Sequence, residues 1–89
     1  MTKIFSLNFS YDESNYYCLI KPIVDGNKIE YYVTVKFVEF GFALQEEYII
    51  CQENGQILNE GSDSIIRKKT TQALKDYLGK RRVLASVNH

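Results

Sequence analysis

The 89-residue sequence has little of the chemistry that catalysis commonly uses. It contains one histidine, one proline, two cysteines and no tryptophan. The histidine is His89, the last residue, where a catalytic geometry is hardest to hold, so we expect no Cys-His or Ser-His pair. The sequence also lacks a CxxC motif, a P-loop and a dinucleotide-binding fingerprint. We therefore expect a protein that is not an enzyme and that has no cofactor and no metal site.

Long hydrophobic runs are also lacking. Residues 4–9 are too few for the core of an export signal and alternate like a strand. No stretch approaches the roughly 20 apolar residues that a membrane helix needs. The sequence thus predicts a cytoplasmic protein without a membrane partner. Cys18 and Cys51 fall in the second and fourth predicted strands, about 9–10 Å apart, so free thiols are expected and not a disulfide.

The composition is that of a folded domain. Hydrophobic residues make up 45% of the chain and charged residues 25%, with seven tyrosines and five phenylalanines. This much apolar surface can offset the entropy lost on folding, which excludes disorder. The length suits one domain. We place this domain at residues 1–79 and expect a basic, flexible tail over residues 80–89.

Alternating apolar residues and hairpin signals predict the sheet. The alternation favours four strands, at residues 3–9, 16–23, 28–39 and 46–52. Asp25-Gly26-Asn27 and Asn54-Gly55 are hairpin signals, and the second predicts a short edge strand over residues 56–59. We expect residues 40–45 to form a loop. Pro22 removes a ladder donor, so it is expected near a hairpin end or at a bulge.

A helix is predicted to follow the strands. Ser62, Asp63 or Ser64 can cap its N-terminus, and Gly79 suits the left-handed position just past its end. One apolar stripe recurs at helical spacing. It comprises Ile66, Thr70, Ala73, Leu74, Tyr77 and Leu78. The fold class is therefore α+β: an antiparallel β-meander of four to five strands, followed by one C-terminal α-helix packed on one sheet face.

The hairpin at Asp25-Gly26 assigns the two faces of the sheet, because a two- or four-residue loop preserves the pairing parity. The predicted core face holds Tyr16, Cys18, Ile20, Tyr31, Val33, Val35 and Phe37. The opposite face holds Tyr17, Leu19, Lys21, Tyr32, Thr34, Lys36 and Val38. For the strand at 46–52 the choice stays open between Tyr48 with Ile50 and Ile49 with Cys51.

One helix cannot cover both faces, so the second face is a candidate contact surface. We predict a small protein-interaction module that self-associates, as a homodimer, or docks a partner protein. The candidate contact residues are Tyr17, Leu19, Tyr32, Val38, Phe40 and Phe42. Around Gly41, the two phenylalanines have two interpretations: a knob or lid for a partner, or a plug that folds under the sheet edge into the core. The plug is the favoured one.

The charge distribution supports an alternative function. Residues 1–65 carry four Lys/Arg and ten Asp/Glu, whereas residues 66–89 carry seven and one. Such asymmetry can indicate an anionic partner, and nucleic acid or another polyanion is the alternative ligand. The candidate contacts are Arg67, Lys68, Lys75 and Arg82. A solvated helix face explains the same residues more simply. An enzyme without a familiar motif is the second alternative.

Overall fold

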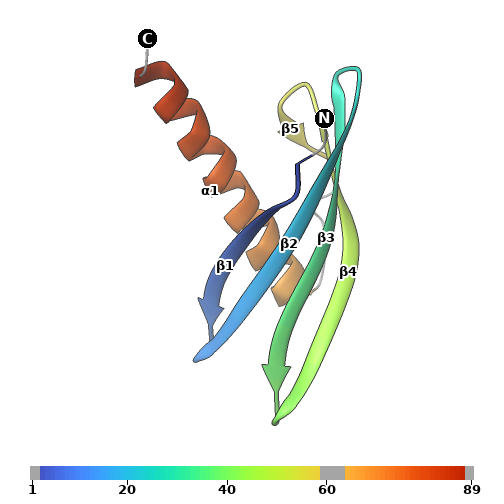
Figure 1. Cartoon of the computed structure of the whole chain (residues 1–89), viewed down its shortest axis with the longest axis vertical. Coiled ribbons are helices and arrows are strands. Elements are labelled where there is room, and N and C mark those ends of the chain that lie inside the picture. Colours follow the sequence, from blue (N-terminus) through green and yellow to red (C-terminus); the bar gives the residue numbers. More distant parts are fainter. Residues whose placement is uncertain (1–2, 59–63, 88–89) are drawn as a thin grey trace.

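The computed structural model describes residues 3–58 and 64–87, with the surroundings of side chains described as far as Lys80. The described part is a five-stranded antiparallel sheet followed by one helix, as the sequence predicts (Figure 1). The strands are β1 (Phe5–Tyr11), β2 (Ser14–Asp25), β3 (Lys28–Glu39), β4 (Phe42–Glu53) and β5 (Gln56–Ile57), and the helix is α1 (Ile65–Val87). The strands lie side by side in chain order, so the sheet is a simple meander.

Each successive pair of strands is joined by a two-residue turn. Gly26 and Asn27 connect β2 to β3, and Asn54 and Gly55 connect β4 to β5, at the two predicted hairpin signals. Asn54 and Gly55 both have positive φ angles, 53° and 84°. Asparagine and glycine reach this region at low cost, which is why such pairs favour tight hairpins.

The predicted loop over residues 40–45 is wrong. β4 already begins at Phe42, and the turn consists of Phe40 and Gly41, with φ angles of 51° and 79°. Gly41 supplies the left-handed conformation at no steric cost. A phenylalanine rarely occupies the other turn position, so the usual hairpin signal was absent. The strand that follows is longer at its start than the sequence predicts.

The pairing register confirms the face assignment in β2 and β3. Cys18 pairs with Val35 and Ile20 with Val33, on the face that also carries Leu7 of β1. Every residue predicted for the core face is buried. The buried apolar residues are Tyr16, Cys18, Ile20, Tyr31, Val33, Val35, Phe37, Ile50 and Leu74. The two-residue turn at Gly26 preserves the parity on which this assignment depends.

The register also decides which face of β4 is buried. Val33 pairs with Tyr48 and Tyr31 with Ile50, so these β4 side chains face the core and Ile50 is only 1% exposed. Further along the strand, the Tyr31 hydroxyl donates to Oε1 of the buried Gln52 at 2.6 Å. Cys51 therefore lies on the opposite face. Because alternate residues of a strand point to opposite sides, this choice holds for the whole of β4.

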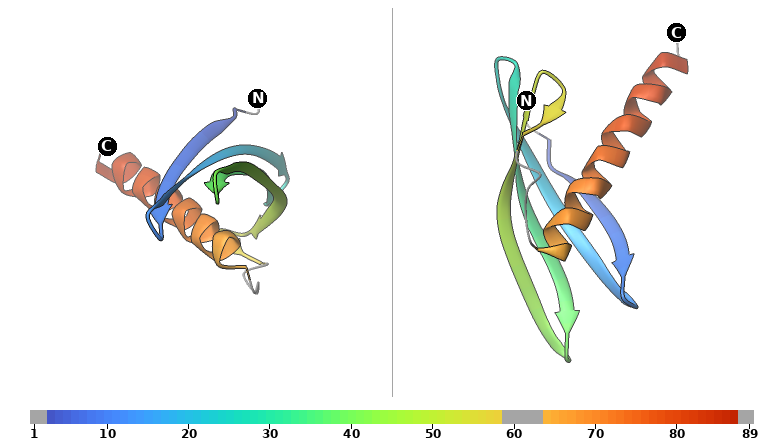
Figure 2. Two further views of the ribbon diagram at one scale, coloured as in Figure 1. Left: turned by 90° about the horizontal axis from the view of Figure 1, so that it is seen from below. Right: turned by 180° about the vertical axis from the view of Figure 1, so that it is seen from behind.

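Helix α1 crosses the core face of the sheet (Figure 2). Thr70 and Leu74, on the side of α1 that faces the sheet, are fully buried. Tyr77 of α1 stacks on Phe5 of β1 with ring centroids 4.6 Å apart. Ser64 is the N-cap, because its side-chain oxygen accepts from the backbone N–H of Arg67 at 3.2 Å. The predicted apolar stripe is therefore the side of α1 that contacts the sheet.

The helix does not end at Gly79 as predicted. It continues to Val87, and its C-terminal half diverges from the strands (Figures 1 and 2). Gly79 does not adopt a positive φ angle. One glycine inside a helix costs only about 1 kcal/mol relative to alanine, and the lysine and arginines that follow are good helix formers. Ser62, Asp63 and His89 lie outside the described residues.

Pro22 and the cysteines follow the sheet topology. The pairing of β1 with β2 stops at Phe5 and Ile20, so Pro22 lies where β2 is bonded on one side only. Cys18 and Cys51 do not form a disulfide and lie on opposite faces of the sheet. Burial raises the pKa of the Cys18 thiol, and its contact with the Thr70 hydroxyl at 4.0 Å partly opposes that shift.

Candidate functional site

The side of the sheet away from α1 is named the open face here. It comprises Tyr17, Leu19, Lys21 and Ile23 of β2; Glu30, Tyr32, Thr34, Lys36 and Val38 of β3; and Gln45, Glu47, Ile49 and Cys51 of β4. Tyr17 is 42% exposed, Tyr32 41% and Val38 57%, while Leu19 is half-buried between its neighbours. These fractions show that the described part of the chain leaves this face uncovered.

Cross-strand pairing brings the central candidates together. Leu19 pairs with Thr34, and in the neighbouring rows Tyr17 pairs with Lys36 and Tyr32 with Lys21. Each tyrosine therefore lies beside a lysine, whose alkyl stem can extend the apolar surface while its charge stays in water. The result is an amphipathic surface with an apolar middle and charges of both signs around it.

The two phenylalanines lie at the tip of the β3–β4 hairpin, Phe40 in the turn and Phe42 at the start of β4. Phe40 is 90% exposed and Phe42 is 70% exposed, so the prediction that they plug the core is wrong. Phe42 pairs with Glu39 and lies on the core side of β4. The hairpin extends past the start of α1, so the helix does not reach it (Figure 1). Both rings are accessible at the tip of the hairpin.

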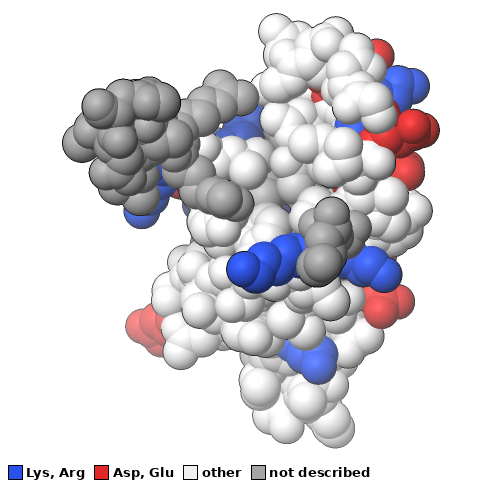
Figure 3. All heavy atoms as spheres, turned by 45° about the horizontal axis from the view of Figure 1, so that its top comes forward, with Lys and Arg blue, Asp and Glu red and all other residues white. Residues whose placement is uncertain are grey.

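The predicted polyanion contacts on α1 differ in their exposure to solvent. The Arg67 guanidinium lies 4.9 Å from the centroid of the Tyr48 ring and donates to the Ile49 carbonyl at 3.4 Å, so it faces the sheet. Lys68 is exposed, whereas Lys75 is half-buried. The side chain of Arg82 lies outside the described residues. On the face drawn in Figure 3, lysine and arginine side chains stand in separate groups between neutral atoms.

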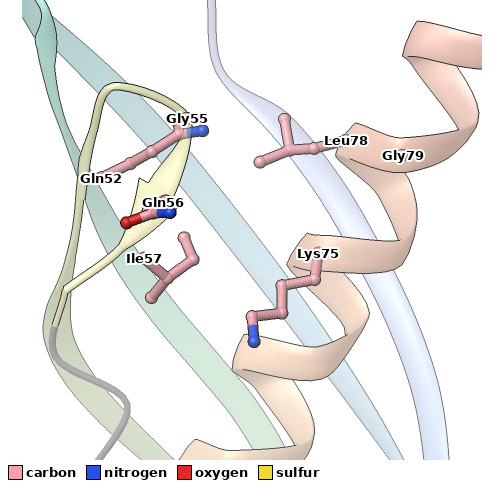
Figure 4. Close-up of a pocket in the computed structure, with 7 residues that line it drawn as sticks. All are labelled: Gln52, Gly55, Gln56, Ile57, Lys75, Leu78 and Gly79. Atoms are coloured by element: carbon pink, nitrogen blue, oxygen red, sulfur yellow. The ribbon is translucent and has the colours of Figure 1, made fainter.

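A hollow lies between β5 and the diverging half of α1 (Figure 4). Its volume is about 460 Å³, and its lining residues are Gln52, Gly55, Gln56, Ile57, Lys75, Leu78 and Gly79. Amide groups and one amine make it polar. None of its lining residues is a cysteine, histidine, aspartate or glutamate. The hollow therefore offers hydrogen bonds but no pair of groups suited to proton transfer.

Tyr48 is a titratable group that the fold alters strongly. Burial raises its pKa to about 12, while the Thr70 hydroxyl nearby and then Arg67 act in the opposite direction. Its hydroxyl is buried without a hydrogen bond of acceptable geometry among the described atoms, so burial outweighs the Thr70 contact. Tyr48 remains neutral at ordinary pH. It supports the stacked Arg67 and faces the core, away from solvent.

Part of the open face was missed at the level of the sequence. Ile23 is 38% exposed there, and Ile49 and Cys51 complete its β4 column. If the two-residue turn at Phe40 and Gly41 had been recognised in the sequence, Ile49 and Cys51 could have been assigned to the open face. The length of that turn fixes which residues of β3 and β4 share a face. Ile23 was overlooked because the predicted strand ended at it.

Three further observations concern the whole described chain. Among residues 3–58 and 64–87, no three His, Cys, Asp or Glu side chains gather closely enough to bind a metal ion. The described helix lacks a segment with the length and apolarity that a bilayer crossing requires. Neither a protein-family model, nor a curated protein, nor a solved structure matches this chain.

Proposed function

We propose that this chain is a small protein-interaction module whose contact surface is the open face. The observation that carries the proposal is the exposure of Tyr17, Tyr32 and Val38 on a sheet whose helix lies on the other side. Contiguous apolar and aromatic surface on a small domain is typical of a contact site. Tyrosine is among the residues enriched in interfaces, because its ring is apolar and its hydroxyl can remain hydrated.

The open face is large enough for a specific interface. Together with the same side of the adjacent β1, the open face spans four strands. At a spacing of about 4.8 Å, and over roughly ten residues of about 3.4 Å each, four strands give on the order of 650 Å² of sheet before side-chain relief is added. A standard interface buries about 800 Å² on each partner. The face therefore matches one side of an ordinary protein complex and needs no contribution from the helix.

The conformation of Phe40 gives a second reason. A bulky residue with a φ angle of 51° is a backbone outlier, and this one is 90% exposed. Strain of this kind tends to occur at functional sites. Glycine or asparagine would occupy the same turn position at lower cost. An aromatic ring kept there suits contact with a partner at the end of the sheet.

The helix is the weaker candidate for binding. Arg67 contacts Tyr48 and the Ile49 carbonyl, and Lys75 is half-buried, so the predicted polyanion contacts do not share one exposed surface. Binding to a polyanion would fall steeply with salt. No binding of single- or double-stranded nucleic acid at low salt, with wild-type protein, is the result we expect.

The first test introduces a charge at the centre of the open face. Tyr32→Asp should keep the far-ultraviolet circular dichroism spectrum of the wild type but lose association in sedimentation velocity experiments. Lys68→Asp, on the outer side of α1, is the control and should behave like the wild type. Desolvating a carboxylate in an interface without a partner is costly, which is why the Tyr32→Asp variant should dissociate.

A second arm covers a partner other than this chain. A photo-crosslinking amino acid placed at position 32 should form protein crosslinks in cells, and the same amino acid at position 68 should not. The proposal is wrong if wild-type protein is a monomer at millimolar concentration and position 32 also gives no crosslink to any protein.

A further inference from the structure

We infer that the occupant of the open face is a second copy of this chain, placed so that Lys36 of each copy faces Glu30 of the other. The two copies are related by a two-fold axis that lies between the sheets, perpendicular to the strands, and passes over Val33 of β3. This inference rests on the proposed function and adds the partner and the geometry.

The first support is the position of the two charges. Lys36 and Glu30 both lie on the open face of β3, each three residues from Val33. Both side chains are exposed. Neither forms an ion pair with another described residue of its own chain. Three residues span about 10 Å along a strand, so a two-fold axis at Val33 places each lysine over the glutamate of the other copy.

The second support comes from the flanking strands. Val33 pairs with Ile20 of β2 and Tyr48 of β4, so the same axis passes over these residues. On β2, Leu19 then faces Lys21 of the second copy; on β4, Glu47 faces Ile49. Tyr32 faces Thr34. No two like charges are opposite each other in this arrangement, and the two Lys36–Glu30 contacts form symmetrically, as an isologous interface requires.

Neighbouring two-fold positions are unfavourable for electrostatic reasons. Thr34 pairs with Glu47, so an axis over Thr34 also passes over Glu47 and places it against Glu47 of the second copy. Tyr32 pairs with Lys21, so an axis over Tyr32 places Lys21 against Lys21 of the second copy. An axis that runs along β3 instead of across it brings Lys36 against Lys36. Like charges opposed in an interface cost binding energy, so the charges of the open face favour the axis over Val33 above these three alternatives.

The geometry assigns different roles to the centre and the ends of the face. Leu19, Thr34 and Tyr32 lie in the two rows next to the axis, together with Lys21, Glu47 and Ile49, and the apolar contact among these rows supplies affinity. The Lys36–Glu30 contacts lie about 10 Å to either side of the axis. Charge pairs in such positions contribute modestly to affinity but fix orientation and register.

The test is a charge reversal followed by mixing. Lys36→Glu places two glutamates against each other at both symmetric contacts, and Glu30→Lys does the same with lysines. Each variant alone should dimerise about ten- to thirtyfold more weakly than the wild type. Mixed together, the two variants should form a heterodimer with near wild-type affinity, since every contact again joins opposite charges. Lys68→Glu is the control of equal charge change and should leave the dimerisation constant unaltered.

The outcomes separate this inference from the proposed function. The inference is overturned if the mixed variants associate no better than each alone, or if the double variant with both reversals fails to recover affinity. The proposed function still stands in that case if Tyr32→Asp abolishes association of the wild-type chain. A wild type that is a monomer in sedimentation equilibrium also overturns the inference, whereas crosslinks from position 32 to a different protein would retain the proposed function.

Discussion

The turn at Phe40 offers a direct test of how the sheet is held. Phe40 has a φ angle of 51° and is 90% exposed, so the residue pays a backbone cost without burying its ring. Replacing it with asparagine keeps the two-residue turn, because asparagine with glycine is a preferred pair for this geometry. We therefore predict that Phe40→Asn makes the isolated domain more stable.

The size of the effect follows from the conformation. A left-handed residue costs roughly 1–2 kcal/mol for an ordinary L side chain, and asparagine recovers part of this through local hydrogen bonding. With almost no apolar burial lost, we expect a gain of about 0.5–1 kcal/mol in the free energy of unfolding. For a domain of this size, such a gain raises the Tm by roughly 2–8 °C.

The assay is thermal unfolding followed by circular dichroism, at a concentration where the wild type is monomeric. Phe42→Asn is the matched control, since Phe42 is also exposed, at 70%, but lies at the start of β4 without a positive φ angle. Asparagine is a poor strand former, so this control should be neutral or destabilising. A Phe40→Asn variant that loses stability, or that shifts the Tm as the control does, would refute the reasoning.

Three further changes test the core and the helix. Leu74→Ala removes a fully buried side chain and should lower the free energy of unfolding by about 2–5 kcal/mol in urea titrations. Ser64→Ala removes the N-cap and should cost about 1 kcal/mol in the same measurement. The pKa of Tyr48 is raised to about 12, so stability that depends on its neutral form is complete below about pH 10 and is lost as the pH rises toward about 12. Tyr48→Phe should reduce this alkaline loss and leave neutral-pH stability unchanged or slightly higher, because the buried hydroxyl has no well-formed hydrogen bond; a large loss of stability at neutral pH would contradict this.

The central part of the candidate site could be predicted because strands alternate. Tyr17, Leu19 and Tyr32 follow from one hairpin signal at Asp25 and Gly26, since a two-residue turn fixes which residues share a face. The same alternation predicts the core residues of β2 and β3. Side-chain chemistry alone cannot separate a contact surface from a face covered by other segments, so the exposure of these residues required the tertiary structure.

The prediction failed where tertiary contacts decide. Phe42 is as apolar as any core residue, yet it is exposed because the hairpin extends past the start of the helix. The polyanion contacts were predicted from the excess of Lys and Arg in residues 66–89, which does not reveal that Arg67 stacks on Tyr48. Charge distribution along the sequence shows where cations are concentrated, but the packing of the helix against the neighbouring strand determines which of them are exposed to solvent.

The sequence by itself determined the α+β class, the order of the strands and the two faces of β2 and β3, because all of these depend on periodicity and turn chemistry within short segments. Only the tertiary structure decided the buried face of β4, the turn at Phe40 and the continuation of α1 past Gly79. Each of these depends on a balance in which a small local cost is offset by contacts or pairing with residues distant in the chain. Local propensity cannot measure that balance.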